Sequence, residues 1–422
     1  MLAPSPMLRR CYSLLPLVLL VTSLLTGCGM FGETLPDKPG APVAASSSSA
    51  KSSSPARPTA PRSSSSSSAP PPLPATYDLP QTIATFKRLL PARVTDANDW
   101  ANDVGIAMGA LRIPLTPDNV CAVLATIEQE SSFSADPEVP NLPTLVKREI
   151  EVRRSRYSIP EVIVEKGLQQ KSRDGRSWGA RVDALRTESD VSLLYEELSG
   201  LLPDVARKYQ PDNPVHTAGA MQVNVAFAEE HAKQKPYPWG RVASVRRETF
   251  TRRGGLYFGV ALLLDYKVAY DHPRYRFADY NAGRFASRNA AFQQALSRIS
   301  GQALALDGDL LIYEGINRPS PTPSNTQKVL ESLSASLGVP RADVRRELLQ
   351  EKSEAFEKTR LWQRVFLMAD AAAKQTLPRF ILPQIAVQSP KFKRTLTTTG
   401  YAASVEQRWS TCMARQRASH GL

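Results

Sequence analysis

Three short segments of the chain carry residue types that could do chemistry together. They are Glu-Ser-Ser-Phe at residues 130–133, Gly-Ala-Met-Gln-Val at 219–223 and Tyr-Asn-Ala-Gly at 280–283. The first offers a carboxyl group, and the others offer amide and phenol side chains that could line a cleft around it. Taken singly, each is equally well explained by packing or by a helix end. Helical periodicity does not select the acid, because Glu128 and Glu130 both flank the same apolar stripe.

Metal-dependent and serine-nucleophile chemistry find no support in the sequence. The four histidines are not paired at ligand spacing, and neither His-Glu-x-x-His nor Cys-x-x-Cys occurs. A Gly-x-Ser-x-Gly nucleophile elbow and a glycine-rich phosphate loop are also missing from the sequence. We therefore expect neither a metal nor an organic cofactor.

In their order, the three segments resemble the motifs of the lysozyme-like domain of lytic transglycosylases. That family carries Glu-Ser-x-Phe on a helix, then Gly-Leu-Met-Gln, then Ala-Tyr-Asn-Ala-Gly. The first and third agree closely, whereas Ala220 stands where the second motif has leucine. An apolar stretch at residues 255–270 also lies where the family has a helix. The resemblance covers about residues 95–300 and implies a mostly α, lysozyme-like fold of the soluble lytic transglycosylase type.

The resemblance also implies that Glu130 is the catalytic acid and base. A carboxyl group at a helix end, partly sunk in a cleft, loses solvation, so its pKa rises and it can protonate a glycosidic oxygen near neutral pH. Ordinary glycoside hydrolysis uses two carboxyl groups, and no second one belongs to these motifs. The same residue would then act as base, helping the muramic acid 6-hydroxyl to attack its own anomeric carbon. The expected products are 1,6-anhydro ends on peptidoglycan glycan strands.

The other motif residues are assigned to the substrate by the same resemblance. Ser131 would shape the oxocarbenium side of the site, and Met221 and Gln222 would line the sugar cleft. Tyr280 would hydrogen-bond and orient the catalytic carboxyl group, while Asn281 would hold the loop or contact sugar. The alternative for each of them is a purely structural role in packing or in a turn.

The chain departs from the family pattern in the distance between its first two motifs. About 90 residues separate them, so we expect a large helical insertion over about residues 141–215. The insertion could be a lid, a substrate-binding lobe or a partner surface, and Glu149 or Glu151 could supply a second carboxyl group. Two alternatives therefore stay open. One is a hydrolytic muramidase that uses water and leaves reducing ends, and the other is a peptidoglycan-binding scaffold without turnover.

Helices are the elements expected to position these residues. Thr116 followed by Pro117 is typical of a helix start, and this helix would carry the first motif. Further helices are expected at 100–111, 255–270, 285–298 and 340–374, with short strands at 223–225 and 310–313. We place a boundary near Ser300, so that residues 77–300 form the lysozyme-like domain and 301–422 form a helical C-terminal extension.

The N-terminus is typical of an exported lipoprotein. Arg9 and Arg10 precede an apolar run at residues 14–25 that is too short for a comfortable membrane span. Leu-Thr-Gly-Cys at 25–28 resembles the bacterial lipobox, so residues 1–27 are predicted to be a signal peptide and Cys28 to carry acyl chains. Gly29 in place of aspartate favours the outer membrane, facing the periplasm. The alternatives are an ordinary signal peptide or an uncleaved anchor.

Residues 28–76 are rich in serine, proline and alanine. Such a composition cannot bury enough apolar surface to offset the entropy of ordering, so we expect a disordered tether. With a contour length of about 150 Å, the tether could let the folded part extend from a membrane to a nearby target. The alternative is a spacer whose exact length is unimportant.

Charge and cysteine usage complete the expectations. The formal charge is +13, which suits an anionic partner, but export argues against nucleic acid. Arginines in residues 251–258 and 284–288 could meet peptide-stem carboxylates of peptidoglycan or form ion pairs within the domain. Cys121 and Cys412 would share an oxidising compartment, so a disulfide is expected between them, with two buried free thiols as the alternative.

Overall fold

A computed structural model describes residues 79–201, 213–314, 318–387 and 396–419. The predicted signal peptide, Cys28 and the tether lie outside these residues. Within the described ranges the chain is mostly helical, with 17 α-helices, one 3-10 helix and two small two-stranded sheets. No helix in these ranges is long and apolar enough to cross a membrane.

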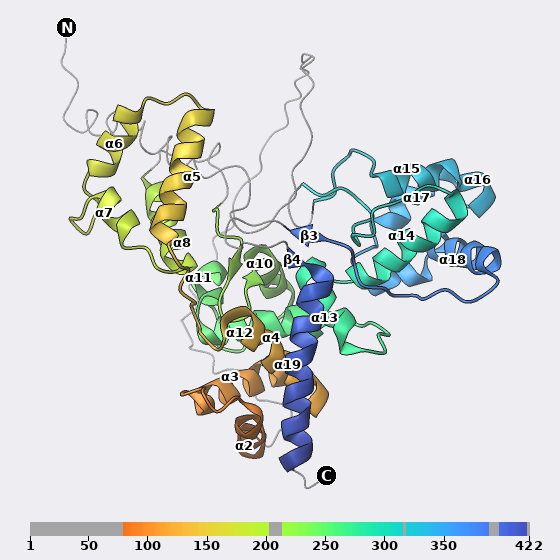
Figure 1. Ribbon diagram of the computed structural model, residues 1–422, viewed down its shortest axis with the longest axis horizontal. Helices are drawn as coiled ribbons and strands as arrows, with labels where there is room; N and C mark the ends of the chain where they lie inside the picture. Colours follow the sequence, from red (N-terminus) through yellow and green to blue (C-terminus); the bar gives the residue numbers. More distant parts are fainter. Residues whose placement is uncertain (1–78, 202–212, 315–317, 388–395, 420–422) are drawn as a thin grey trace, which may run out of the picture.

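The buried side chains of the described residues form three apolar clusters, and the helices of the central one, which carries the predicted motifs, can be followed in Figure 1. Its helices come from both ends of the described chain and are α2 (Leu79–Leu89), α3 (Ala97–Ala110), α4 (Pro117–Ser131), α10 (Val225–Gln234), α11 (Val245–Thr249), α12 (Arg252–Leu264), α13 (Pro273–Ala282) and α19 (Thr398–Ser419). Strands β1 (Thr217–Ala218) and β2 (Val223–Asn224) pair antiparallel across the second motif.

The second cluster is built from the chain that follows α13. Its helices are α14 (Ala286–Ser300), α15 (Asn325–Ser332), α16 (Ser334–Leu337), α17 (Arg341–Leu348), the 3-10 helix η1 (Glu354–Lys358) and α18 (Arg360–Ala373). The apolar run at 310–313 forms only an isolated bridge at Tyr313, because Leu310 and Leu311 pack into this cluster and no neighbouring strand pairs with them. Strands β3 (Ala386–Val387) and β4 (Leu396–Thr397) then lead into α19.

The third cluster is formed by the segment predicted to be an insertion, and the described residues of this segment are mostly helical. It contains α5 (Leu142–Arg156), α6 (Glu161–Gln169), α7 (Trp178–Asp183) and α8 (Glu188–Gly200), drawn at the upper left of Figure 1. Its apolar residues also contact Val215 and Phe250, next to the central cluster. The insertion therefore packs against the central helices through its own small core.

Helix α4 begins and ends where its local chemistry requires. The Thr116 hydroxyl accepts a hydrogen bond from the Asn119 amide at 3.3 Å, and Pro117 occupies the first turn. Residues 120–127 are all buried. The helix ends because Ser132 and Phe133 adopt positive φ angles of 51° and 67°. Glu130 consequently lies in the last turn, at the edge of the central cluster.

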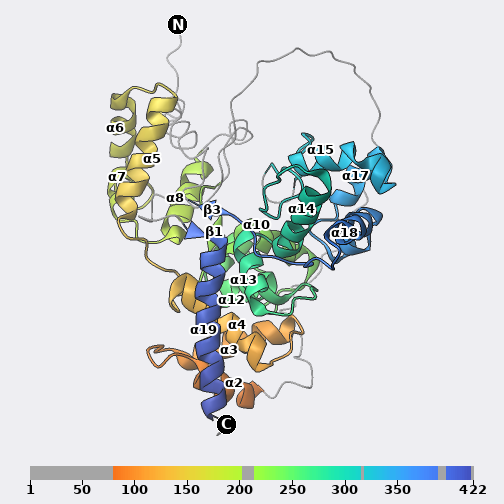
Figure 2. The same cartoon turned by 45° about the vertical axis from the view of Figure 1, so that its right-hand side comes forward.

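The last helix returns to this cluster. Figures 1 and 2 show α19 running beside α4 and α13, and it packs mainly against these two helices. The predicted disulfide between Cys121 and Cys412 is confirmed and joins α4 to α19. The described part of residues 301–422 is thus divided between two cores, because α15 to α18 belong to the second cluster and α19 belongs to the central one.

Candidate functional site

Glu130 is held in a setting that favours its protonated form. Burial raises the pKa of Glu130 to about 7, and the Tyr401 hydroxyl, which donates to Oε1, lowers it by a smaller amount. A carboxyl group with this pKa is populated in both protonation states near neutral pH. It can therefore give a proton in one step and take one in the next.

Tyr280 lies beside this carboxyl group but makes a different hydrogen bond from the predicted one. Burial raises the pKa of Tyr280, and the negative charge of Glu130 raises it further. The two groups therefore share one environment. The Tyr280 hydroxyl donates its single proton to the carbonyl oxygen of Met221, at 2.6 Å. The prediction that Tyr280 donates to Glu130 is therefore wrong, and Tyr401 holds that place.

The second motif forms the turn that receives Tyr280. Gly219 has a φ of 75°, and a Cβ there would lie 2.2 Å from the carbonyl oxygen of Thr249, so only glycine fits. Gln222 also adopts a positive φ, of 48°, and its backbone N–H donates to the Gly219 carbonyl oxygen at 2.9 Å. The turn thereby presents the Met221 carbonyl to the phenol of the third motif.

The side chains of the second motif have unequal access to solvent. Met221 is fully buried, and its side chain faces Gly259 of α12. It therefore does not line an open cleft, contrary to the prediction, because the missing side chain at Gly259 leaves room for it in the core. Gln222 is half-buried, and its Oε1 accepts from the Thr217 hydroxyl at 3.0 Å.

Ser131 and Asn281 make contacts within the fold. The Ser131 hydroxyl donates to the Ile127 carbonyl at 3.1 Å, one turn back along α4. The Asn281 Oδ1 accepts from the hydroxyl of Thr398 at 2.9 Å, which joins the third motif to the first residue of α19. Asn281 thus holds two elements together, and its predicted contact with substrate stays a prediction.

Asp279 is a further buried group that fixes the third motif, and sequence reasoning did not select it. Its carboxylate accepts from the backbone amides of Phe285 and Ser287, at 2.9 and 2.7 Å, and from the Tyr270 hydroxyl at 2.7 Å. Burial raises the pKa of Asp279 to about 6, and these hydrogen bonds lower it less. Through these hydrogen bonds Asp279 fixes the connection between α13 and α14, next to Tyr280.

Two more residues missed from the sequence come from α19. Tyr401 donates to Glu130, and the hydroxyl of Ser404 donates to Oε1 of Gln129 at 2.9 Å. No local pattern around Tyr401 points to the first motif. The one usable signal was the cysteine pair, since a bond from Cys412 to Cys121 brings the last helix alongside the helix of Glu130.

The two candidates for a second carboxyl group have other partners. Glu149 is paired with Arg153, and Glu151 with Arg154 at 2.6 Å, all on α5. Neither of them contributes to the raised pKa of Glu130, which comes from burial alone. Among the described residues, no acidic group therefore contributes to the pKa shift of Glu130.

The arginines near the third motif are engaged inside the domain. Arg252 pairs with Asp103 at 2.7 Å, and Arg253 pairs with Glu248 at 2.6 Å. Arg284 donates to the Leu262 carbonyl at 3.1 Å, and Arg288 donates to the Ser353 carbonyl at 2.8 Å. Of the two predicted roles for these segments, the structure favours ion pairs and hydrogen bonds within the domain.

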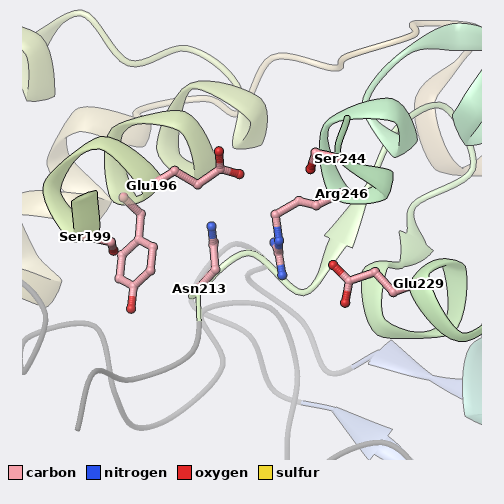
Figure 3. Close-up of a pocket in the computed structure, with 7 residues that line it drawn as sticks. Glu196, Ser199, Asn213, Glu229, Ser244 and Arg246 are labelled. Carbon is pink, nitrogen blue, oxygen red and sulfur yellow. The ribbon is translucent and has the colours of Figure 1, made fainter. Parts of the chain in front are cut away.

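A separate polar hollow of about 350 Å³ lies between α8 of the insertion and helices α10 and α11 (Figure 3). It is lined by Tyr195, Glu196, Ser199, Asn213, Glu229, Ser244 and Arg246. None of the lining residues belongs to the three motifs, so the hollow is distinct from the Glu130 site. In the part of the chain described, no cluster of three or more His, Cys, Asp or Glu side chains could hold a metal ion.

Comparison with known proteins gives a family but no activity. A family model described as "Protein of unknown function (DUF1615)" matches residues 93–415. The uncharacterized protein YaiW of Escherichia coli strain K12 is 42% identical over 327 residues, which cover 78% of this chain and 88% of that protein. No solved structure gives a significant match. The matched span contains Glu130, Tyr280 and Tyr401, so the candidate site lies inside the shared region.

Proposed function

The chain belongs to this DUF1615 family, and we propose that it is a peptidoglycan lytic transglycosylase with Glu130 as its acid and base. The observation that carries the proposal is the place of the Glu130 carboxyl group, in the last turn of α4, where partial burial raises its pKa to about 7 and Tyr401 donates to it. The same group lies next to the tyrosine of the third motif. A pKa near the working pH suits a residue that must first donate a proton and then accept one.

The reaction needs only this one carboxyl group. Protonated Glu130 gives its proton to the oxygen between muramic acid and glucosamine, and the bond from that oxygen to the muramic acid anomeric carbon breaks. The resulting carboxylate then takes the proton of the muramic acid 6-hydroxyl while its oxygen bonds to the anomeric carbon. Glu130 ends protonated again, no water is consumed, and the product carries a 1,6-anhydro end.

The lack of a described acidic partner favours this route over hydrolysis. Hydrolytic glycosidases use a second carboxyl group as base or nucleophile, and no acidic neighbour contributes to the pKa of Glu130. We propose the lysozyme-like fold on the same grounds, since the three motifs of the resemblance lie on α4, on the β1–β2 turn and on α13. Measuring whether the purified protein cleaves peptidoglycan distinguishes the enzyme from the non-catalytic scaffold.

The proposed location is the outer membrane, facing the periplasm, with acyl chains on Cys28. The disulfide between Cys121 and Cys412 supports a place outside the cytoplasm, where such bonds persist. Attachment at Cys28 would hold a wall-cleaving domain close to its substrate. Labelling with a fatty acid analogue, lost in Cys28→Ala, tests the anchor.

The activity is tested by digesting purified sacculi with the full-length chain in detergent and analysing the muropeptides by mass spectrometry. We expect 1,6-anhydro products that disappear in Glu130→Gln. Glu128→Gln is the matched control, because Glu128 lies on the same helix and pairs with Arg93 at 2.6 Å. Products with reducing ends would support the hydrolytic muramidase instead. Binding to sacculi without any product would support the peptidoglycan-binding scaffold.

A further inference from the structure

Helices α4 and α19 meet in a fixed antiparallel register. The bonds between them include the Trp409 Nε1 to Asp118 carbonyl hydrogen bond at 3.3 Å, the Cys121–Cys412 disulfide, the Ser404 to Gln129 hydrogen bond at 2.9 Å and the Tyr401 to Glu130 hydrogen bond. From the disulfide onward, the contact positions on α4 advance from 121 to 130, while those on α19 recede from 412 to 401. The covalent bond therefore lies near one end of the pair, and the candidate catalytic group lies at the other.

The disulfide controls the same face of α19 that carries Tyr401. Cys412 follows Tyr401 by 11 residues, which is about three turns of helix, so both side chains point in nearly the same direction. Cys121 and Cys412 are both buried, and so is Val405, which lies between Tyr401 and Cys412 along α19. Fixing Cys412 on Cys121 consequently sets both the rotation of α19 and its position along α4.

Tyr401 has a definite effect on Glu130. Its hydroxyl donates to Oε1 and so stabilises the charged carboxylate, which lowers the pKa of Glu130 against the larger effect of burial. The same hydrogen bond ties the orientation of the carboxyl group to α19. The direction in which Glu130 presents its proton thus depends on where α19 lies.

We infer that the Cys121–Cys412 disulfide is a positioning element of the proposed reaction, since it holds the Tyr401 hydroxyl on Glu130. The inference rests on the proposed function and adds a condition to it. A chain whose thiols stay reduced, as in the cytoplasm, keeps Glu130 but loses the firm placement of its hydrogen-bond donor. The site is completed only in a compartment where the bond persists.

The test compares the pH dependence of anhydro-product formation in four full-length chains: wild type, Tyr401→Phe, Cys121→Ala/Cys412→Ala and the triple variant. Because the first step needs protonated Glu130, the rate falls as pH rises through the Glu130 pKa. In Cys121→Ala/Cys412→Ala we expect this fall at higher pH, together with a loss of kcat of about 10- to 100-fold and little change in KM. The triple variant should shift no further than Tyr401→Phe, since both changes act through one hydrogen bond.

The variant Val365→Ala is the control for a loss of stability that leaves the site unchanged. It opens a cavity in the second cluster, away from α19. This control should lower the melting temperature and leave the pH dependence at its wild-type position. A folded Cys121→Ala/Cys412→Ala chain with the wild-type pH dependence would overturn the inference. If that chain does not fold, wild type reduced by a phosphine below its melting temperature replaces it. Its shift should reverse on reoxidation, and a fully reduced, folded chain without any shift overturns the inference equally.

Failure of the proposed function gives a different result. Wild type would then release no anhydro products at all. The titration of the Glu130 carboxyl group can still be followed by infrared difference spectra against Glu130→Gln, in the oxidised and the reduced chain. A higher pKa on reduction supports the positioning role, and identical titrations contradict it.

Discussion

Tyr401 donates a hydrogen bond to Glu130 across 271 residues of sequence. This hydrogen bond makes α19, the last described helix, part of the candidate site around Glu130 of the first motif. Each residue affects the other, because the charge of Glu130 also helps to raise the pKa of the Tyr401 phenol, after burial. The C-terminal helix is therefore part of the candidate site and not an appendage to it.

Replacing Tyr401 by phenylalanine should raise the pKa of Glu130 above about 7, because burial then acts without the donor that opposes it. The ring still fills its place, so we expect a folded chain. The rate of anhydro-product formation should decline at higher pH than in wild type. A Tyr401→Phe profile that coincides with wild type would show that the hydroxyl does not influence the carboxyl group.

Replacing Asp279 by asparagine should destabilise the protein by about 1–3 kcal/mol. The carboxylate accepts four hydrogen bonds, from the amides of Phe285 and Ser287 and from the hydroxyls of Tyr266 and Tyr270. An asparagine NH2 group would face some of these donors. Denaturant unfolding measures the loss. Asp271→Asn, at an exposed position, is the control and should change little.

The parts of the site set by local chemistry were predictable. The start of α4 follows from a threonine cap and a proline at residues 116 and 117, since both act within one turn. The buried helix before the third motif was expected from its apolar composition and is observed as α12, ending at Leu264. The predicted helix at 340–374 is divided into α17, η1 and α18.

The parts set by tertiary packing were not predictable from one sequence. Nothing near Tyr401 indicates a partner 271 residues away, and the Tyr280 hydroxyl proton goes to the Met221 carbonyl because the β1–β2 turn presents that oxygen. Met221 was expected in the cleft and lies in the core, since only the three-dimensional fold brings Gly259 opposite to it. Pairings between distant elements depend on the whole fold and leave little trace in local patterns.

Gly259→Ala tests how the turn of the second motif is supported. A Cβ on Gly259 would lie 2.4 Å from Sδ and 2.6 Å from Cβ of Met221, so Met221 must move, and with it the carbonyl that receives Tyr280. Overpacking of this kind costs about 1–3 kcal/mol, and we also expect reduced turnover. Gly200→Ala on α8 is the matched control, because a Cβ there meets no atom within 4 Å. Equal stability of the two variants would mean that Met221 relocates freely.

The pH dependence of stability should carry a contribution from His231. This side chain is buried in an aromatic cluster with Phe227, Tyr257 and Phe258, and its Nε2 has no hydrogen-bond partner among the described residues. Burial lowers the pKa of His231 to about 4, from 6.5. Between these two pH values the unfolded chain binds more protons than the folded one, so this contribution to stability falls as pH falls, by about 3 kcal/mol in all.

Glu130 and Asp279 act in the opposite sense, because their pKa values are raised on folding and protons favour the folded chain in their range. The contribution of His231 is therefore isolated by comparing wild type with His231→Phe in chemical denaturation from pH 7.5 to 4. We expect the free energy of unfolding of wild type to fall relative to that of His231→Phe as the pH is lowered to 4, because phenylalanine cannot take up the proton. A constant difference over the whole range would mean that His231 titrates alike in the folded and unfolded chain.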